Sequence, residues 1–178
     1  MFEDYRDLVD FIGFCPQDDV LIDRLTVREN LIFFCRFKGV ENEDEVVDEV
    51  LASYNLKPSE ATLAKHLSGG QKRKLQLAIA LLGDAKIVLL DEPSSGMDPT
   101  ARREAWEIIQ KAKQDRIVIL TTHYMDEAEQ LADRVAIISN GSLQACGSAL
   151  FLKNKYGSGF FIEVEPENAG VNTEENLL

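Results

Sequence analysis

Cysteines are few in this 178-residue sequence, and none belongs to a CxxC pair. Cys15, Cys35 and Cys146 are odd in number and widely spaced, which argues against a disulfide framework or a zinc site and favours a reducing compartment. We therefore expect no disulfide partner. Long apolar runs are also missing, since a membrane-spanning helix needs roughly 20 apolar residues. The acidic N-terminus lacks an apolar core and does not resemble a secretory signal.

Basic charge is scarce beside acidic charge: 19 Lys and Arg stand against 31 Asp and Glu, for a formal net charge of −12. Most of this excess falls in two segments without bases, residues 41–50 and residues 163–178. A nucleic-acid-binding protein would need a concentrated basic stripe, and the sequence has none, so we expect no nucleic-acid partner. We interpret the first segment as a solvated helix face and the second as a loose tail.

Apolar periodicity and capping residues divide the chain into alternating strands and helices. Strands are expected at residues 11–15, 87–90, 117–120, 135–138, 142–146 and 160–165. Helices are expected at residues 26–37, 43–54, 68–82, 98–112, 124–132 and 148–156. Capping boxes mark the helix starts at Thr26 and Ser68, and the pair Asn140 and Gly141 indicates a hairpin turn.

The two apolar runs at residues 87–90 and 117–120 are continuous, as expected for strands covered on both faces. Strands that alternate with helices predict an α/β layered fold with a mostly parallel sheet. Residues 18–66 contain no strand pattern, so we expect a helical subdomain inserted after the first strand. The basic run at residues 72–74 is expected to be a solvated helix face.

The segment at residues 86–99 (KIVLLDEPSSGMDP) carries the strongest chemical signal. A predicted strand ends there in two adjacent carboxylates, Asp91 and Glu92, and ligands of parallel sheets bind at such strand ends. One carboxylate can hold Mg²⁺, directly or through a water. The other can orient or deprotonate an attacking water. A polar loop after a buried strand would explain the same pair.

Three further segments carry groups suited to a phosphate or a metal. Residues 67–71 (LSGGQ) place two glycines at a helix start, where open N–H groups and the helix dipole form an anion cradle. His123 follows a predicted strand and could touch a phosphate oxygen or position a water. Gln17 follows the first strand, and its amide could reach a metal or a water. The alternatives are an ordinary helix cap, a structural histidine and an exposed turn glutamine.

Together, Gln17, LSGGQ (67–71), LLDEP (89–93), Asp98 and His123 resemble the nucleotide-binding domain of ATP-binding cassette (ABC) proteins. Longer stretches are similar to the A subfamily of ABC transporters, many of whose eukaryotic members move lipids or sterols. These stretches are IGFCPQ (12–17), SSGMDPTARREAW (94–106), LTTHYMDEAEQLADRVAI (120–137) and CGSALFLKNKYGSGF (146–160). The resemblance implies a domain that binds and hydrolyses ATP with Mg²⁺ and powers transmembrane transport.

The resemblance also implies chemical roles for the residues at the strand ends. Gln17 would sense Mg²⁺ and water and couple to the membrane domains, and Asp91 would help to hold Mg²⁺. Glu92 would be the general base for attack by water. His123 would be the switch histidine that completes this catalytic group.

A second group of residues would face a partner by the same resemblance. Ser68, Gly69, Gly70 and Gln71 would form the signature motif, which closes on the γ-phosphate of an ATP held by a second nucleotide-binding domain. Asp98 would be the D-loop residue that contacts the partner across the dimer. The transporter's transmembrane domains would be the other partner, so the domain would be membrane-associated on the cytosolic side.

A P-loop of the form GxxxxGK[ST] is missing, since the 11 glycines include no Gly-Lys pair. We therefore expect a fragment of a larger product that lacks the N-terminal strand, P-loop and helix and is inactive alone. Strands such as residues 87–90 would then expose apolar faces or edges. A non-catalytic half-site that lends its signature motif to a partner cassette is the alternative.

We expect residues 1–165 to form a partial ABC ATP-binding domain. Within it, residues 18–84 would be the helical subdomain with the signature motif, and residues 85–140 would be the core with the Walker B, D-loop and H-loop segments. Residues 166–178 would be an acidic tail. A DNA-repair or chromosome-maintenance ATPase is disfavoured, because the sequence shows neither a sustained heptad pattern nor a basic stripe.

Overall fold

The computed structural model describes residues 11–157, which form two compact units that divide between Asp133 and Arg134. The strand predicted at residues 160–165 and the tail predicted at residues 166–178 lie outside the described residues. None of the helices within residues 11–157 is long and apolar enough to cross a bilayer. Each unit is described by itself below.

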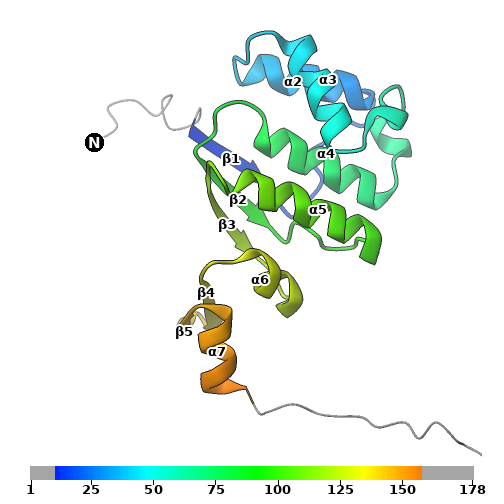
Figure 1. The fold of residues 1–178 in the computed structure, drawn as a ribbon. Coiled ribbons are helices and arrows are strands. Elements are labelled where there is room, and N and C mark those ends of the chain that lie inside the picture. Colours follow the sequence, from blue (N-terminus) through cyan, green and yellow to red (C-terminus); the bar gives the residue numbers. More distant parts are fainter. Residues whose placement is uncertain (1–10, 158–178) are drawn as a thin grey trace, which may run out of the picture. The chain divides into compact units, whose positions relative to one another are not determined.

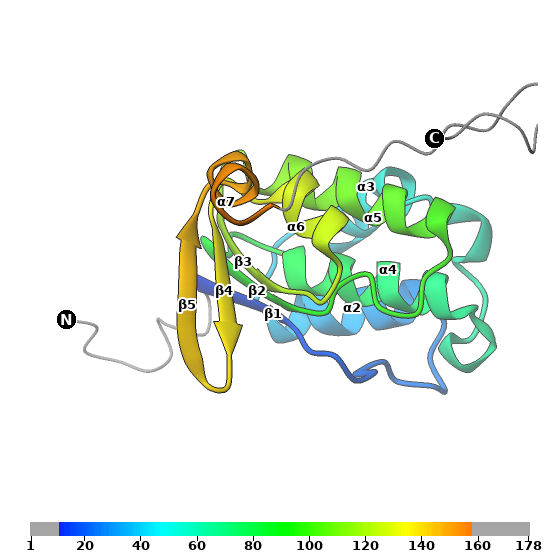
Figure 2. The ribbon, with the colours of Figure 1, turned by 90° about the horizontal axis from the view of Figure 1, so that it is seen from below.

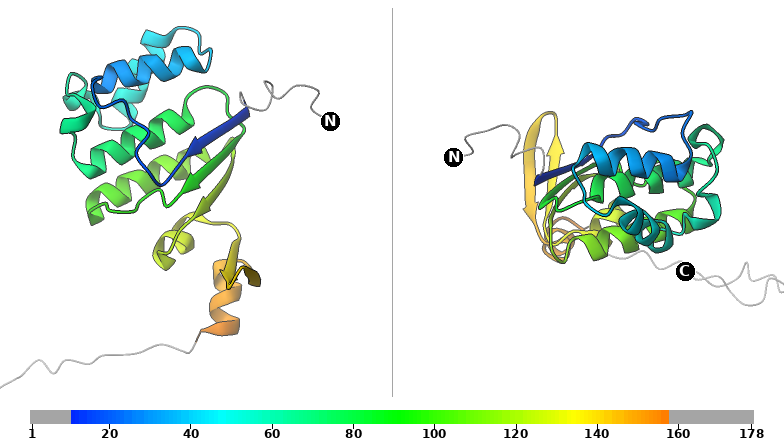
Figure 3. Two further views of the ribbon diagram at one scale, coloured as in Figure 1. Left: turned by 180° about the vertical axis from the view of Figure 1, so that it is seen from behind. Right: turned by 90° about the horizontal axis from the view of Figure 1, so that it is seen from above.

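The first unit is built on a three-stranded parallel sheet with the order β1-β2-β3. Its strands are β1 (Ile12–Cys15), β2 (Ile87–Asp91) and β3 (Ile117–Thr121), and β2 lies in the middle, as the view from behind shows (Figure 3). All three were predicted from apolar runs. Because the strands are parallel, their carboxyl ends lie at one edge of the sheet, where Gln17, Asp91 and His123 follow.

Helices cover one face of this sheet (Figures 1 and 2). Helix α4 (Gly69–Leu81) packs on β1 and β2, and α5 (Pro99–Ala112) lies beside α4. Helices α2 (Val27–Phe37) and α3 (Glu43–Ser53) pack on the far side of α4, followed by the short 3₁₀ turns η1 (Lys57–Ser59) and η2 (Ala64–His66). Helix α6 (Met125–Leu131) follows β3 and packs on α5. The predicted α/β layered fold is therefore confirmed.

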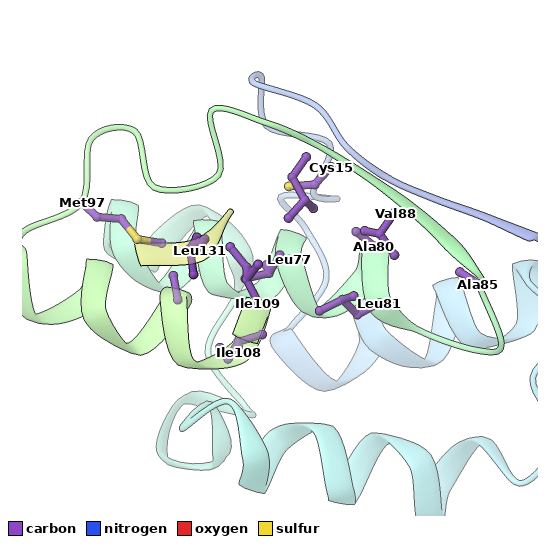
Figure 4. Close-up of a cluster of buried hydrophobic side chains, with 12 residues drawn as sticks. Cys15, Leu77, Ala80, Leu81, Ala85, Val88, Met97, Ile108, Ile109 and Leu131 are labelled. Atoms are coloured by element: carbon purple, nitrogen blue, oxygen red, sulfur yellow. The ribbon is translucent and has the colours of Figure 1, made fainter. Parts of the chain in front are cut away.

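Helix α4 is buried on all sides because it belongs to two apolar cores. On one side Leu77, Ala80 and Leu81 pack against the sheet and α5, together with Cys15, Val88 and Ile109 (Figure 4). On the other side Leu75, Ala78, Ile79 and Leu82 pack against α2 and α3. A helix that is apolar around most of its circumference is buried in this way.

The two ends of α4 are held by different means. At its start the Ser68 hydroxyl accepts from the Gln71 backbone N–H at 3.2 Å, and the Gln71 side chain accepts from the Ser68 N–H at 3.0 Å. At its end the Lys38 ammonium donates to the carbonyls of Ile79, Ala80 and Leu82. Arg116 donates to two further carbonyls, those of Leu81 and Gly83. Cations at these last carbonyls also suit the helix dipole.

The sheet corrects one expectation about burial and bears out part of another. Strands β2 and β3 were expected to be covered on both faces, but within residues 11–133 helices cover only one. Val88 and Leu90 are buried on that face, whereas Ile117 and Ile119 are 62% and 56% exposed on the other. Exposed apolar faces or edges were expected at residues 87–90, and the structure bears out the first: Ile87 and Leu89 on the uncovered face are only half-buried, whereas both edges of β2 are paired.

Within residues 134–157 the second unit contains a hairpin and one helix. Strands β4 (Val135–Ser139) and β5 (Ser142–Gly147) pair antiparallel, and α7 (Ala149–Tyr156) follows. Asn140 and Gly141 have φ angles of +50° and +71°, the left-handed pair of a tight hairpin turn. Ser148 caps α7 by accepting from the Phe151 N–H at 3.2 Å. The predicted hairpin and the helix that follows it are confirmed.

Candidate functional site

Arg73 joins the carboxyl ends of β1 and β2 to the first turns of α4. Its side chain is buried, and its nitrogens donate to backbone carbonyls after both strands. The acceptors are Pro16 at 2.5 Å, Gln17 at 3.3 Å, Glu92 at 2.9 Å, Pro93 at 3.0 Å and Asp91. A sixth acceptor is Oε1 of Gln76, at 3.0 Å on the same helix. The planar guanidinium presents five N–H donors in a fixed fork, which suits such a set of acceptors.

The burial of Arg73 overturns the expectation that the basic run at residues 72–74 is solvated. Arg73 is 5% exposed and Lys74 is 7% exposed. Lys74 pairs with Glu104 of α5 at 2.7 Å, and Lys72 pairs with Asp19 at 3.3 Å. The sequence did contain a signal, because the apolar residues from Leu75 onward occupy both sides of the helix. Arg73 precedes these residues on the same helix, and its side chain therefore also enters the protein.

Asp91 is the last residue of β2, and its neighbour across the sheet is Thr121 at the end of β3. The Thr121 hydroxyl donates to Oδ1 of Asp91. This contact fixes one carboxylate oxygen and leaves the other for a ligand. Sequence reasoning did not assign Thr121 a role, although the register of two parallel strands places it there.

Glu92 has a left-handed backbone with φ of +49°, which is uncommon for a residue other than glycine. Such a conformation costs of order 1 kcal/mol and persists where neighbouring groups hold it. Here the Glu92 N–H donates to the carbonyl of Thr121 at 3.1 Å, and the Glu92 carbonyl accepts from Arg73. The left-handed conformation of Glu92 turns the chain directly after Asp91, the last residue of β2.

His123 lies beside the Glu92 carboxylate. Its Nδ1 atom is 2.7 Å from Oε2 of Glu92, within ion-pair distance for a protonated imidazole. The His123 side chain is 59% exposed, whereas that of Glu92 is 18% exposed. The structure thus brings together two residues that the sequence analysis took from different strand ends.

The glycine-opened start of α4 is capped as predicted. The Nε2 atom of Gln71 also donates to the Ser59 hydroxyl at 2.9 Å, which ties the cap to η1. A methyl group built on Gly69 would meet nothing within 4 Å, so this position is open. A methyl on Gly70 would lie 3.2 Å from Cβ of Ala101 on α5. The starts of α4 and α5 are therefore close neighbours.

Asp98 caps α5 by accepting from the N–H groups of Thr100 at 2.9 Å and Ala101 at 3.1 Å. These backbone hydrogen bonds lower the pKa of its carboxyl group, and Lys74 adds to the shift. Gln17 is exposed, and its backbone carbonyl is held by Arg73. Among residues 11–157 no hydrogen bond or ion pair links the segment at residues 68–71 directly to the carboxylates of Asp91 or Glu92.

The donor set at the sheet edge fits a hard cation better than a soft one. No group of three or more His, Cys, Asp or Glu side chains converges on one point within the described part of the chain. Asp91 offers a carboxylate and Gln17 an amide, both oxygen ligands of the kind that Mg²⁺ accepts together with waters and substrate phosphates. Burial raises the pKa of the Cys15 thiol, which disfavours the thiolate that a soft cation would need.

Comparisons with known proteins agree with this geometry. The sequence profile of the ABC transporter family matches residues 3–95. The phospholipid-transporting ATPase ABCA3 of Rattus norvegicus is 49% identical over 158 residues, which are 88% of this chain and 9% of that protein. ATP-binding cassette sub-family A member 2 of Homo sapiens is 48% identical over 151 residues, or 84% of this chain and 6% of that protein. The chain thus spans less than a tenth of the length of these relatives.

The fold has a counterpart among solved structures. An ATP-binding subunit of an ABC transporter superposes with a TM-score of 0.74 and is 24% identical, over 85% of this chain and 65% of that one. At this identity the match supports the fold alone, whereas the matches above concern the sequence. The chain therefore belongs to the ABC transporter family and is similar throughout its matched length to the nucleotide-binding domains of the A subfamily.

Proposed function

We propose that the chain is part of the ATP-hydrolysing domain of an ABC transporter that moves lipids across a membrane. The observation that carries the proposal is the 2.7 Å contact between His123 and Glu92, next to Asp91 at the carboxyl end of a parallel strand. Lipids are the proposed cargo because the similar proteins include phospholipid-transporting ATPases.

In this proposal Glu92 is the general base that orients and deprotonates the attacking water. Its restrained backbone and the neighbouring imidazole of His123 hold the carboxylate in one place, and a fixed base needs less reorganisation during the reaction. His123 has enough exposure to reach a phosphate oxygen as well.

Mg²⁺ would be held by Asp91 and Gln17, whose oxygens suit it. When bound, the ion supplies charge neutralisation at the phosphates. Thr121 keeps Asp91 oriented for this task, and Arg73 fixes the main chain of both ligands at once. The two ligands come from different strands, so their spacing depends on this shared guanidinium.

The segment at residues 68–71 and Asp98 would face a second nucleotide-binding domain. Backbone N–H groups at the start of α4 favour an anion such as the γ-phosphate of an ATP held by the partner. Gly69 leaves this approach open. The transmembrane domains would be the other partner, with this domain on the cytosolic side. In this proposal residues 1–165 belong to the ATP-binding domain, with residues 18–84 as its helical subdomain and residues 85–140 as its core. Residues 166–178 are the proposed acidic tail.

The test supplies the missing P-loop. A P-loop segment from a similar ABC transporter is fused upstream of the whole 178-residue chain, and Mg²⁺-dependent ATP hydrolysis is measured. We expect hydrolysis by the fusion, and a Glu92→Gln variant that still binds ATP but turns over at least ~100-fold more slowly. Glu45→Gln, a matched change on the exposed face of α3, should leave turnover unchanged. Equal turnover of the Glu92→Gln variant would remove Glu92 from this role.

A half-site function is favoured by one observation, the open space beside Gly69 at the start of α4. It is tested by adding the purified chain to a cassette domain with an intact P-loop and a disabled signature motif. Recovery of ATP hydrolysis above that of either component would support the half-site. No recovery, together with an active fusion, would leave only the catalytic function.

A further inference from the structure

We propose that Arg102 and Tyr124 are positioning residues that hold the His123 ring against Glu92. The function of this arrangement rests on the proposed role of Glu92, but the arrangement itself can be tested without hydrolysis. It consists of four side chains that contact one another in turn: Arg102 lies on Tyr124, Tyr124 packs on His123, and His123 contacts Glu92.

The His123 ring needs such support because more than half of its side chain is exposed. The ring centroids of His123 and Tyr124 are 4.0 Å apart with an interplanar angle of 39°. Packing at this distance restricts rotation of the imidazole about its side-chain torsions. An exposed side chain without such a neighbour samples several rotamers.

Arg102 holds Tyr124 from the opposite end of the group. Its guanidinium carbon lies 4.1 Å from the centroid of the Tyr124 ring, within the range of a cation–π contact. Its Nε atom is buried without a hydrogen-bond partner in the described part of the chain, and Nη1 lies 3.9 Å from Asp126. A guanidinium removed from water on that side gains more from the aromatic face than a solvated one does.

The segment after His123 is fastened to the same face of α5 as Arg102. The Trp106 indole donates to Oε1 of the fully buried Glu127 at 3.0 Å, and Gln110 donates to the carbonyl of Gln130 at 2.7 Å. Lys113 donates to the carbonyl of Leu131 at 3.0 Å. Arg102, Trp106 and Gln110 of α5 and its C-cap residue Lys113 recur every three or four residues, so they form one stripe on the helix.

This stripe makes α5 the support for the whole segment that carries His123. Asp98 caps the same helix, on the side that the proposed function assigns to a partner. A displacement of the start of α5 would therefore be passed to the His123 ring through Arg102 and Tyr124.

The experiment uses nuclear magnetic resonance of the histidine rings in the full 178-residue chain. The sequence has two histidines, so each ring is assigned by one substitution, and His66 serves as an internal reference. We expect Tyr124→Leu to shift and broaden the His123 ring signals while the His66 signals stay in place. Tyr124→Phe keeps the ring and should keep the wild-type His123 signals.

Arg102 separates positioning from the direct magnetic effect of the Tyr124 ring. Arg102→Met leaves both rings present, yet it should shift the His123 signals and increase side-chain motion, and Arg102→Lys should restore them in part. Arg103→Met, at the exposed neighbouring position, is the matched control and should change nothing. Wild-type His123 signals in both Arg102→Met and Tyr124→Leu would overturn the proposal.

The two proposals fail in different ways. If the fusion with a P-loop does not hydrolyse ATP but the ring signals respond as expected, the positioning stands and the proposed function falls. If the fusion is active and the ring signals do not respond, the reverse holds. If Tyr124→Leu alters the His66 signals too, that variant has changed the fold. The positioning is then tested by the single variants Arg102→Met, Arg102→Lys and Tyr124→Phe alone.

Discussion

The Nδ1 atom of His123 lies 2.7 Å from Oε2 of Glu92. Asp91 faces Thr121 in the parallel register of β2 and β3, so the residues that follow the two strands emerge side by side. Glu92 then turns back through its left-handed backbone, which brings its carboxylate toward the imidazole. Glu92 and His123, which are 31 positions apart in the sequence, thus meet because of register and one backbone bend.

Replacement of His123 should slow ATP hydrolysis by the P-loop fusion. We expect His123→Gln to lower turnover by about 10-fold to 100-fold, because Glu92 loses the side chain that lies against its carboxylate and helps to position it. ATP affinity should change little. His66→Gln, at an exposed position in η2, is the control. Steady-state kinetics on both variants check this, and equal turnover in the two would contradict it.

Replacement of Arg73 should destabilise the fold strongly. Arg73→Met leaves several carbonyls at the sheet edge without their donor, and we expect the free energy of unfolding to fall by about 3–5 kcal/mol. Arg73→Lys should recover only part, since an ammonium cannot reach acceptors in three segments at once.

The control for Arg73 is Lys72→Met on the neighbouring position, which removes a single ion pair with the exposed Asp19. Such a pair is worth about 0–1 kcal/mol. Urea unfolding followed by circular dichroism measures all three variants. Similar losses for Arg73→Met and Lys72→Met would show that Arg73 does not join the strand ends.

A methyl group at Gly13 should not be tolerated. In the structure it would lie 2.1 Å from the carbonyl oxygen of Ala80, where α4 crosses β1. We expect Gly13→Ala to lower the free energy of unfolding by about 3 kcal/mol, since the strand and the helix must separate. Gly69→Ala meets open space and should change stability by less than about 1 kcal/mol. Thermal unfolding of the two variants checks the difference.

The pH dependence of stability should carry a contribution from Lys38. Burial, with a smaller effect of Arg116, lowers the pKa of its ammonium from 10.5 to about 8 in the folded chain. Between these two pH values the unfolded chain binds the proton that the folded chain has released. The free energy of unfolding therefore rises with pH across this window, by up to about 3 kcal/mol. Below about pH 8 this contribution is constant.

The contribution of Lys38 is isolated by comparison with Lys38→Met, because other groups also titrate in alkaline solution. Burial raises the pKa of Tyr54 to about 12, for example, which has the opposite effect on stability. The difference in unfolding free energy between wild type and Lys38→Met should grow in favour of wild type from pH 8 to pH 10.5. A difference that is flat with pH would show that Lys38 keeps an ordinary pKa.

Local sequence signals were enough for most of the elements. Capping at Thr26 and Ser68 depends on residues three positions apart, and the hairpin at Asn140 depends on two adjacent residues, so neighbours along the chain decide them. The strand ends that carry Gln17, Asp91 and His123 were also readable, because an apolar run stops where polar residues begin.

The burial of individual side chains could not be predicted from local sequence signals. The three bases at residues 72–74 are chemically alike but differ in burial, since Lys72 stays near the surface while Arg73 is buried. The difference comes from the rotation of α4 between two cores, which depends on α2, α3 and the sheet together. The exposure of Ile117 and Ile119 likewise depends on which strands are neighbours and which face the helices cover.

The sequence by itself determined the order of strands and helices, their caps, and the polar residues at the strand ends, because these depend on contacts of short range along the chain. Only the tertiary structure decided that Glu92 meets His123, that Arg73 spans two strand ends, and that α5 supports Tyr124. Those contacts require parallel register and helix packing, and the free energy that sets both is shared among residues distant in sequence.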